Sequence, residues 1–453
     1  MTHTAVLWLR RDLRLTDNPA LTLALADAKH LIPLYIHAPE EEAPWQPGAA
    51  SRWWLHHSLA ALDAQLRRHG SRLIIAHGPS LKTLQQLLSA TGATHLYWNR
   101  LYEPALIARD QQIKRTLREA GIQCTSTNAA LLVEPWTVQT NSGTPFRVFT
   151  PYWRAAQRQL VTMPTPTAAP SQLPPVPATL DSLPLESLKL LPKIDWAGGL
   201  AATWSPGEAG ALAQLDQFIH SAARDYAQQR DFPAKAGTSR LSPFLHFGEI
   251  GPRQILHALD QAGIAAEAYE RELGWREFNH QLLYHFPQTT DAPLNPRFAQ
   301  FPWRECAADD PQLQAWQQGR TGFALVDAGM RELWHSGWMH NRVRMLVASF
   351  LTKHLRLPWT VGARWFWDTL VDADLANNSQ GWQWTAGCGA DAAPYFRIFN
   401  PVRQIERFDP QWQYIHHWCP EWRTDGTPPP PIVDLAAARE EALAAYRQSA
   451  DVK

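Results

Sequence analysis

The stretches VDAGMRELWHSGWMHNRVRML (326–346), LVDADLANNSQGWQW (370–384) and APYFRIFNPVRQ (393–404) decide how the second half of the chain folds. In the first stretch Gly337 ends one helical pattern, and Trp338 and Met339 open the next. On that second helix a set of residues recurs at i, i+3, i+4 and i+7 and so shares one face: Asn341, Arg344, Met345 and Ala348. A face that mixes polar and apolar side chains in this way is typical of a pocket wall that holds a flat, polar ligand.

The second stretch supplies residues that could face this wall. Asp372 and Asp374 bracket one alanine, Asn378 follows at i+4 from Asp374, and Trp382 and Trp384 come next. Each residue alone fits a structural role: an aspartate paired with the arginine of the first wall, a capping asparagine, or a core indole. Their concentration in one short region favours a site for a large aromatic cofactor.

The motifs WMHNR, DADLANN, GWQW and DAAPYFRIFNP closely resemble the flavin-binding core of the photolyase/cryptochrome family. The resemblance runs from LWLRRDLRLTDNPAL near the start of the chain to FNPVRQIERFDP near its end. It implies an FAD-binding protein whose flavin is reduced in the active form.

Length and charge set limits on the function. A chain of 453 residues exceeds the size at which one hydrophobic core stops growing, so two domains are expected. Lys plus Arg equals Asp plus Glu at 42 each, and residues 207–423 carry 20 basic and 23 acidic side chains. If the protein binds DNA, it must do so through a local groove and not through bulk charge.

Cysteine usage and hydropathy favour a soluble cytoplasmic protein, and the family resemblance implies a bacterial protein associated with DNA. The four cysteines are scattered without a CxxC pair, so no metal site is expected. No apolar run approaches the roughly 20 residues of a membrane span, and no signal peptide opens the chain. We expect a monomer that makes no membrane contact.

Residues 1–130 predict an α/β domain. Short apolar strands are expected at 5–9, 31–36, 72–76, 94–98 and 122–126. Helical patterns lie between them, the first with Asn18 as N-cap and Pro19 at its first position, and later ones near 49–69, 81–90 and 104–120. This alternation predicts a doubly wound, parallel five-stranded sheet. No glycine-rich fingerprint follows the first strand, which argues against a dehydrogenase-type nucleotide domain.

A change of composition separates this domain from the rest. Eight prolines fall between residues 164 and 192, so residues 131–205 are expected to form an interdomain linker on the surface. Residues 206–453 show helical patterns almost throughout and predict an all-α, FAD-binding domain.

The segment GTSRLSPFLHFGEIGPRQ (237–254) begins with residues whose N–H groups and hydroxyls can hold phosphate. Taken alone it fits a helix cap better, but the resemblance implies that 238–242 binds the flavin pyrophosphate. The cofactor-binding residues implied in this way are Tyr226, Thr238, Ser239, Arg240, Leu241, Ser242, Tyr269, Arg276, Arg344, Asp372, Ala373, Asp374 and Asn378.

The segment YERELGWREFNH (269–280) places Glu272, Trp275, Arg276 and Asn279 on one helical face. This face could be a surface row of ion pairs, or a wall against which a base stacks while the carboxylate accepts a hydrogen bond. By resemblance Glu272 and Trp275 match the residues that bind the dimer. The full set expected to contact DNA is Arg230, Glu272, Trp275, Asn279, Asn341, Arg342, Met345, Trp384, Arg397, Arg403 and Gln404.

Within the family, Asn378 and Trp384 resemble repair enzymes more than plant-type signalling receptors, which carry Asp at the first position. The closest resemblance is to class I photolyases that act on cyclobutane pyrimidine dimers. It implies that the dimer flips into the pocket and receives an electron from the excited flavin, with Glu272 and Asn378 taking part. The alternative is a blue-light signalling cryptochrome on the same scaffold.

Two further features are implied by the family. Trp382 and Trp359 match the first two members of its tryptophan relay, and Trp303 is taken as the third, although some relatives carry that ring where Cys306 stands. A second, antenna chromophore would be a methenyltetrahydrofolate or a deazaflavin. Ala105 and Leu106 replace the folate-binding pair of relatives, and Leu101 replaces the acidic residue of deazaflavin binders, so the sequence leaves its presence and identity open.

Overall fold

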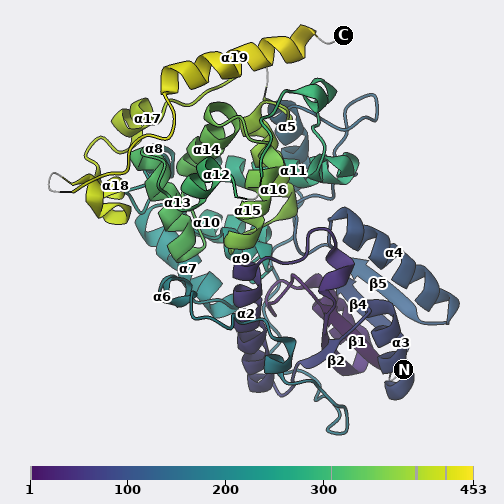
Figure 1. The fold of residues 1–453 in the computed structure, drawn as a ribbon. Coiled ribbons are helices and arrows are strands. Elements are labelled where there is room, and N and C mark those ends of the chain that lie inside the picture. Colours follow the sequence, from purple (N-terminus) through teal and green to yellow (C-terminus); the bar gives the residue numbers. More distant parts are fainter. Residues whose placement is uncertain (1–2, 308, 393–395, 424–425, 452–453) are drawn as a thin grey trace.

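The computed structural model describes residues 3–307, 309–392, 396–423 and 426–451. It has two parts (Figure 1), an α/β part at the lower right and a larger helical part above it. The helix α19 (Leu435–Asp451) runs along the far side of the helical part. The expectation of a sheet domain followed by a mainly helical domain is confirmed.

The α/β part is built on a five-stranded sheet in the order β3-β2-β1-β4-β5. Every neighbouring pair of strands is parallel, as predicted. The strands are β1 (His3–Leu9), β2 (Ala28–His37), β3 (Ile74–His77), β4 (His95–Asn99) and β5 (Gln123–Thr127). Strand β2 begins three residues earlier than expected, because Ala28 and His30 pair with β1 before the apolar run begins.

Helices cover both faces of the sheet. Helices α1 (Pro19–Asp27) and α2 (Ala49–Arg68) pack on the face that carries Leu7, and α3 (Ser80–Thr91) and α4 (Pro104–Glu119) pack on the face that carries Trp8. Asn18 is the N-cap of α1, and its side chain accepts a hydrogen bond from the Leu21 amide, as predicted. The core on the α1/α2 face continues into the helical part.

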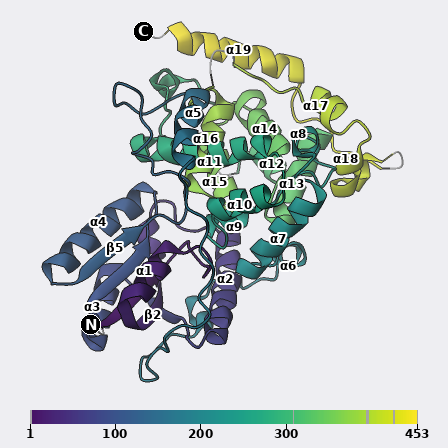
Figure 2. The same ribbon diagram turned by 180° about the vertical axis from the view of Figure 1, so that it is seen from behind.

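Residues 131–205 differ from the expected surface linker. They contain α5 (Phe149–Leu160), the 3₁₀ turn η2 (Leu185–Leu188) and α6 (Gly198–Thr203). Helix α5 packs on α11 (Glu267–His285), and the view from behind shows the two together (Figure 2). Trp153 lies so close to Gly274 that a side chain there would meet the indole at 2.7 Å. The composition signalled a loop, but aromatic residues at i, i+3 and i+4 within it form a buried helical face.

The helical part carries most of the chain. Its remaining α-helices are α7 (Glu208–Ser221), α8 (Tyr226–Gln229), α9 (Ser242–His246), α10 (Pro252–Gln261), α12 (Pro311–Gln317), α13 (Ala324–Ser336), α14 (Asn341–Ser349), α15 (Trp359–Thr369), α16 (Leu375–Ala386), α17 (Pro401–Phe408) and α18 (Gln413–Trp418). Short turns are η1 (Pro39–Glu42) in the α/β part, and η3 (Pro287–Thr290), η4 (Pro296–Gln300), a π-helical turn η5 (Phe350–His354) and η6 (Pro420–Trp422) here. None of the helices in the described ranges combines the length and apolar character that spanning a bilayer requires.

The boundary between α13 and α14 corrects one expectation. Gly337 ends α13 in the left-handed region, with φ of 66°, as its position suggested. The next helix begins at Asn341 and not at Trp338, because the His340 side chain caps it by accepting a hydrogen bond from the Arg342 amide. The four residues expected on one face of α14 all line the same cavity.

One buried arginine joins the two parts. Arg14 follows β1 and is 1% exposed. Its guanidinium donates to the carbonyls of Thr16 at 2.9 Å, Gly248 at 2.8 Å, Asp17 at 2.8 Å and Ala129 at 2.9 Å. Gly248 precedes α10, so this side chain holds the loop after β1 against the helical part.

We expect Arg14→Met to destabilise the protein strongly, because methionine keeps most of the apolar stem but leaves buried carbonyls unpaired. Hydrogen bonds to charged groups contribute about 1.5–3 kcal/mol each, so the free energy of unfolding should fall by roughly 3 kcal/mol or more. Urea denaturation measures the change. The matched control is Arg67→Met, whose side chain is 61% exposed and pairs with Asp63. Equal midpoints for the two variants would contradict the structural role of Arg14.

Candidate functional site

The helical part contains a cavity of about 560 Å³. Side chains from α8, α9, α11, α14 and α16 and from the loop before α16 line it. Among the residues expected at the site, these line it: Tyr226, Arg230, Thr238, Ser239, Arg240, Leu241, Ser242, Tyr269, Glu272, Trp275, Arg276, Asn279, Asn341, Arg342, Arg344, Met345, Asp372, Ala373, Asp374, Asn378, Trp382 and Trp384. Residues far apart in the sequence therefore converge on one space.

Five expected residues do not line the cavity: Trp303, Trp359, Arg397, Arg403 and Gln404. The exposed Arg397 still lies near it, with its guanidinium 5.1 Å from the centre of the Trp384 ring. Arg403 and Gln404 are on α17, outside the cavity wall. Part of the motif that precedes them, residues 393–395, lies outside the described residues.

The segment 238–242 forms a polar edge of the cavity. Ser239 is buried, and its hydroxyl accepts a hydrogen bond from Tyr269 at 2.9 Å. Burial raises the pKa of Tyr269 to about 12, so the phenol stays protonated and donates. Ser242 accepts a hydrogen bond from the Trp338 indole at 3.3 Å. The hydroxyls of Ser239 and Ser242 are thus held in place by aromatic side chains from α11 and from the turn between α13 and α14.

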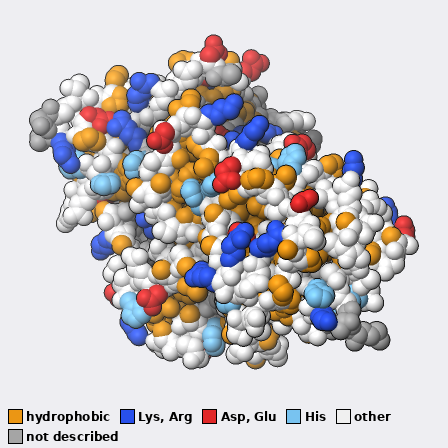
Figure 3. Space-filling view, turned by 90° about the horizontal axis from the view of Figure 1, so that it is seen from below, with side chains coloured by type: hydrophobic (Ala, Val, Ile, Leu, Met, Phe, Trp, Pro, Cys, Tyr) orange, Lys and Arg blue, Asp and Glu red, His pale blue; other side chains and the backbone are white. Residues whose placement is uncertain are grey.

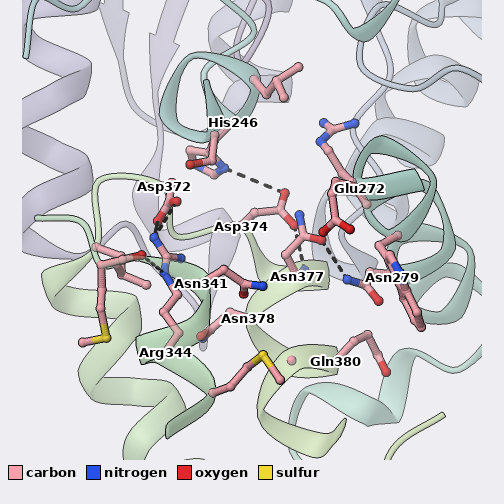
Figure 4. Close-up of a pocket in the computed structure, with 18 of the residues that line it drawn as sticks. His246, Glu272, Asn279, Asn341, Arg344, Asp372, Asp374, Asn377, Asn378 and Gln380 are labelled. Atoms are coloured by element: carbon pink, nitrogen blue, oxygen red, sulfur yellow. Dashed lines mark hydrogen bonds and ion pairs between the residues drawn. The ribbon is translucent and has the colours of Figure 1, made fainter. Parts of the chain in front are cut away.

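Ion pairs and amide contacts fix the opposite wall (Figure 4). Arg344 donates to Asp372 at 2.8 Å and to the Met339 carbonyl at 2.7 Å. The Asn378 amide nitrogen donates to the Ala363 carbonyl of α15 at 2.9 Å. These contacts orient a guanidinium, a carboxylate and an amide toward one space before any ligand arrives.

Asp374 is the centre of a buried charge cluster. It is the N-cap of α16 and accepts a hydrogen bond from the Asn377 amide at 2.8 Å. His280 approaches its carboxylate at 3.4 Å and His246 at 3.8 Å. Burial alone would raise the pKa of Asp374, but the two histidines hold that pKa well below its ordinary value. Burial lowers and the aspartate raises the pKa of His280, and the net shift is upward.

Several buried polar atoms of the cavity wall have no hydrogen-bond partner in the part of the chain that the structure describes. They are Arg240 Nε, Arg342 Nε and Gln380 Oε1. An unsatisfied buried polar group costs about 1–3 kcal/mol, so a wall with three of them is suited to a polar ligand. Trp382, Phe366 and Leu282 add flat apolar surface. The residues present therefore fit a flavin with its phosphates, the cofactor that the resemblance implies.

The partly exposed rim of the cavity carries the residues expected to recognise DNA. Trp275 stacks on Phe149 of α5, with ring centres 3.8 Å apart and planes within 8°. Asn279 donates to Asn377 at 2.9 Å, which joins α11 to α16. Phe149 therefore fixes the orientation of the Trp275 ring while the indole lines the cavity.

Two basic residues of the rim are already paired. Arg230, expected to contact DNA, donates to Glu272. Arg342 donates to Asp231 at 2.7 Å. Arg276 was expected at the cofactor, yet its guanidinium donates to the Ala130 carbonyl at 2.7 Å and so also anchors α11 to residue 130.

The expected tryptophan relay is only partly visible as contacts. Trp382 packs against Gly362, one helical turn after Trp359 at the start of α15, and a side chain at Gly362 would meet the indole at 2.1 Å. The Trp316 ring lies 6.3 Å from that of Trp382. The Trp303 ring lies 4.4 Å from Phe301. The place of Trp303 as third member stays a prediction.

The polar and aromatic residues of this site that sequence reasoning missed include Phe149, Asp231, His246, His280 and Gln380. His280 could have been found, because it lies at i+4 from Arg276 in the helix that was singled out. Phe149 forms an i, i+3, i+4 aromatic pattern with Tyr152 and Trp153, but the segment was expected to be a linker, so this signal was not used. Asp231 and His246 reach the site only through the packing of separate helices.

A second cavity, of about 290 Å³, lies between the two parts. It opens at the carboxyl ends of β1, β2 and β4, where the strand order reverses and α/β sheets commonly bind ligands. Leu101 and Leu106 line it, and His246 and Ala373 line both cavities. This is the place at which an antenna chromophore would fit, next to the first cavity.

Surface charge agrees with the neutral composition. On the face drawn in Figure 3, Lys and Arg side chains are interspersed with Asp, Glu and apolar ones. Charges of both signs so close together weaken the long-range attraction of a polyanion.

Two families match the chain. The family described as the FAD binding domain of DNA photolyase matches residues 269–428, and that described as DNA photolyase matches residues 5–173. A deoxyribodipyrimidine photo-lyase of Agrobacterium fabrum is 44% identical over 98% of this chain and 98% of its own. Cryptochrome-1 of Arabidopsis thaliana is 39% identical over 92% of this chain and 63% of its own.

The crystal structure of a bacterial class III photolyase from Agrobacterium tumefaciens is also similar, with a TM-score of 0.93 and 43% identity. The likeness covers 100% of this chain and 98% of that one. Since this neighbour belongs to class III, the expected membership of class I stays a prediction.

Proposed function

The chain belongs to the DNA photolyase family of FAD-binding enzymes, and we propose that it repairs DNA by splitting cyclobutane pyrimidine dimers in a light-dependent reaction. The observation that carries the proposal is the two-ended cavity. Its buried end has ordered hydroxyls, an Arg344–Asp372 pair and unpartnered polar atoms, and its rim carries Trp275 and Glu272. One space thus offers a cofactor site and a base-stacking surface side by side.

Each group of residues has a separate task. Thr238, Ser239 and Ser242 bind the cofactor phosphates, and Arg344, Asp372 and Asn378 orient its ring system. When bound, the reduced flavin supplies, on absorbing blue light, the electron that opens the cyclobutane ring, and it takes that electron back afterwards. The protein contributes orientation and the exclusion of water.

The rim receives the flipped dimer. Trp275 and Trp384 stack on the bases, and Glu272 accepts a hydrogen bond from a base N–H. Stacking of a base on an aromatic side chain contributes about 1–3 kcal/mol, which offsets part of the cost of extruding the dimer from the duplex. A damaged, poorly stacked dimer leaves the helix more readily than an intact base pair does, so the pocket selects for damage.

A second chromophore in the cavity between the two parts would collect light for the first. His246 and Ala373 separate the two cavities, so the two chromophores would lie near each other. Leu101 and Leu106 offer no charged partner, which favours a ligand held by the arginines and the backbone of this cavity.

The proposed reaction predicts light-dependent repair by the reduced, FAD-loaded protein. Incubation with an oligonucleotide that contains thymine dimers should restore thymines under blue light and none in the dark, as measured by chromatography of the digested DNA. An oligonucleotide with the other pyrimidine photoproduct serves as the control for lesion type. If FAD-loaded protein restores no thymines, the repair proposal is wrong and the signalling cryptochrome is favoured.

We expect Trp275→Ala to weaken binding of dimer-containing DNA by about 1–3 kcal/mol, the value of one stacked base, and to leave binding of undamaged DNA almost unchanged. Binding isotherms for both DNAs measure this. Trp275→Phe keeps a ring against Phe149 and should lose less affinity. Trp334→Ala, at a surface indole that is 59% exposed, is the matched control. Equal weakening of both DNAs by Trp275→Ala would show that this ring is only structural.

The relay prediction concerns photoreduction of the oxidised flavin. Trp382→Phe keeps an aromatic ring against Phe366 and Gly362, but a phenyl ring is oxidised far less readily than an indole, so light-driven reduction should stop. Repair by chemically reduced protein should continue, because it does not use the relay. Absorbance under illumination follows the reduction. Trp303→Phe should slow it too. If Trp316→Phe slows it and Trp303→Phe does not, the third member has been assigned wrongly.

A further inference from the structure

One short segment connects both walls of the cavity rim. Arg230 and Asp231 directly follow α8. Arg230 donates to Glu272 of α11, and Asp231 accepts from Arg342 of α14 at 2.7 Å. Adjacent residues of opposite charge thus hold one residue from each wall.

The Arg342 side chain contacts an aromatic ring as well as Asp231. Its guanidinium lies 4.5 Å from the centre of the Phe408 ring, and its buried Nε has no hydrogen-bond partner among the described residues. Arg342 lines the cavity, whereas Asp231 does not. The Asp231 side chain is 38% exposed against 22% for Arg342. Asp231 therefore covers the arginine on the solvent side and leaves the cavity side accessible.

On the proposed function, damaged and undamaged DNA would meet this arginine from different directions. The phosphates of an undamaged duplex stay outside the cavity and would have to displace Asp231 to reach Arg342. A flipped base inside the cavity could accept a hydrogen bond from the same guanidinium while the ion pair persists, because Asp231 accepts from only one of its five N–H donors.

On the basis of the proposed repair function, we propose that Asp231 is a specificity-determining residue. It occupies Arg342 from the solvent side, so that undamaged DNA gains little from this arginine, and it leaves the arginine available to a lesion inside the cavity. The discrimination comes from withholding a phosphate contact, which lowers nonspecific affinity without weakening binding of the lesion.

The test compares Asp231→Asn with Asp225→Asn in FAD-loaded protein in the dark. Asp225 is exposed on the same segment and contacts Gln229, so its replacement removes the same charge without freeing Arg342. Isotherms are measured for undamaged and dimer-containing duplexes at several salt concentrations. The Asp231–Arg342 pair is partly exposed to solvent and so contributes little, and Asp231→Asn should strengthen undamaged binding by about two- to fivefold. One added phosphate contact should steepen the salt slope by about 0.9.

The expected signature is a fall in the ratio of damaged to undamaged affinity for Asp231→Asn alone. Adding Arg342→Gln to Asp231→Asn should abolish the gain for undamaged DNA. Equal effects of Asp231→Asn and Asp225→Asn would overturn the proposal, as would a loss of affinity confined to the damaged duplex, which would make Asp231 an anchor for Arg342. Light-dependent splitting by the Asp231→Asn protein reports separately on the repair function, so either idea can fail without the other.

Discussion

The guanidinium of Arg14 fixes the geometry on which the site depends. It donates to the carbonyl of Gly248, in the helical part, and to that of Ala129, at the end of the α/β part. The next carbonyl, that of Ala130, accepts from Arg276 of α11, and the Glu277 carboxylate accepts from the amides of Leu132 and Val133. Residues 129–133 are thereby held between the sheet domain and α11. Since α11 carries Glu272 and Trp275, a buried arginine in the first domain determines where the rim of the cavity lies.

The cavity combines many charges with little net charge. Arg344 pairs with Asp372, Arg230 with Glu272, and Arg342 with Asp231. Such pairs orient side chains without creating a long-range field, in agreement with equal numbers of basic and acidic residues in the whole chain. Binding in such a site comes mainly from stacking and from complementarity of shape. This suits a ligand, such as damaged DNA, that is recognised by its distorted geometry.

Ring packing also orients side chains of the cavity rim, and it does so through the segment between the two domains. Phe149 stacks on Trp275 in a nearly parallel arrangement, and Trp153 fits against Gly274 because that residue has no side chain. A proline-rich connection therefore contributes one helix that orients the indole of the rim. The segment is a linker in composition but part of the wall in its packing.

The sequence alone determined the elements and most of the cavity lining. Period-2 and period-3.6 patterns place side chains on faces, so the parallel strands and the shared face of Asn341, Arg344 and Met345 could be predicted. The resemblance then identified residues that belong to one site. Tertiary structure decided which partner each charged group has. Asp231 with Arg342, and His246 with Asp374, come from elements distant in sequence, and local periodicity contains no information about such pairs. It also decided that Phe149 belongs to the wall, because burial of an aromatic face against α11 outweighed the loop-like composition around it.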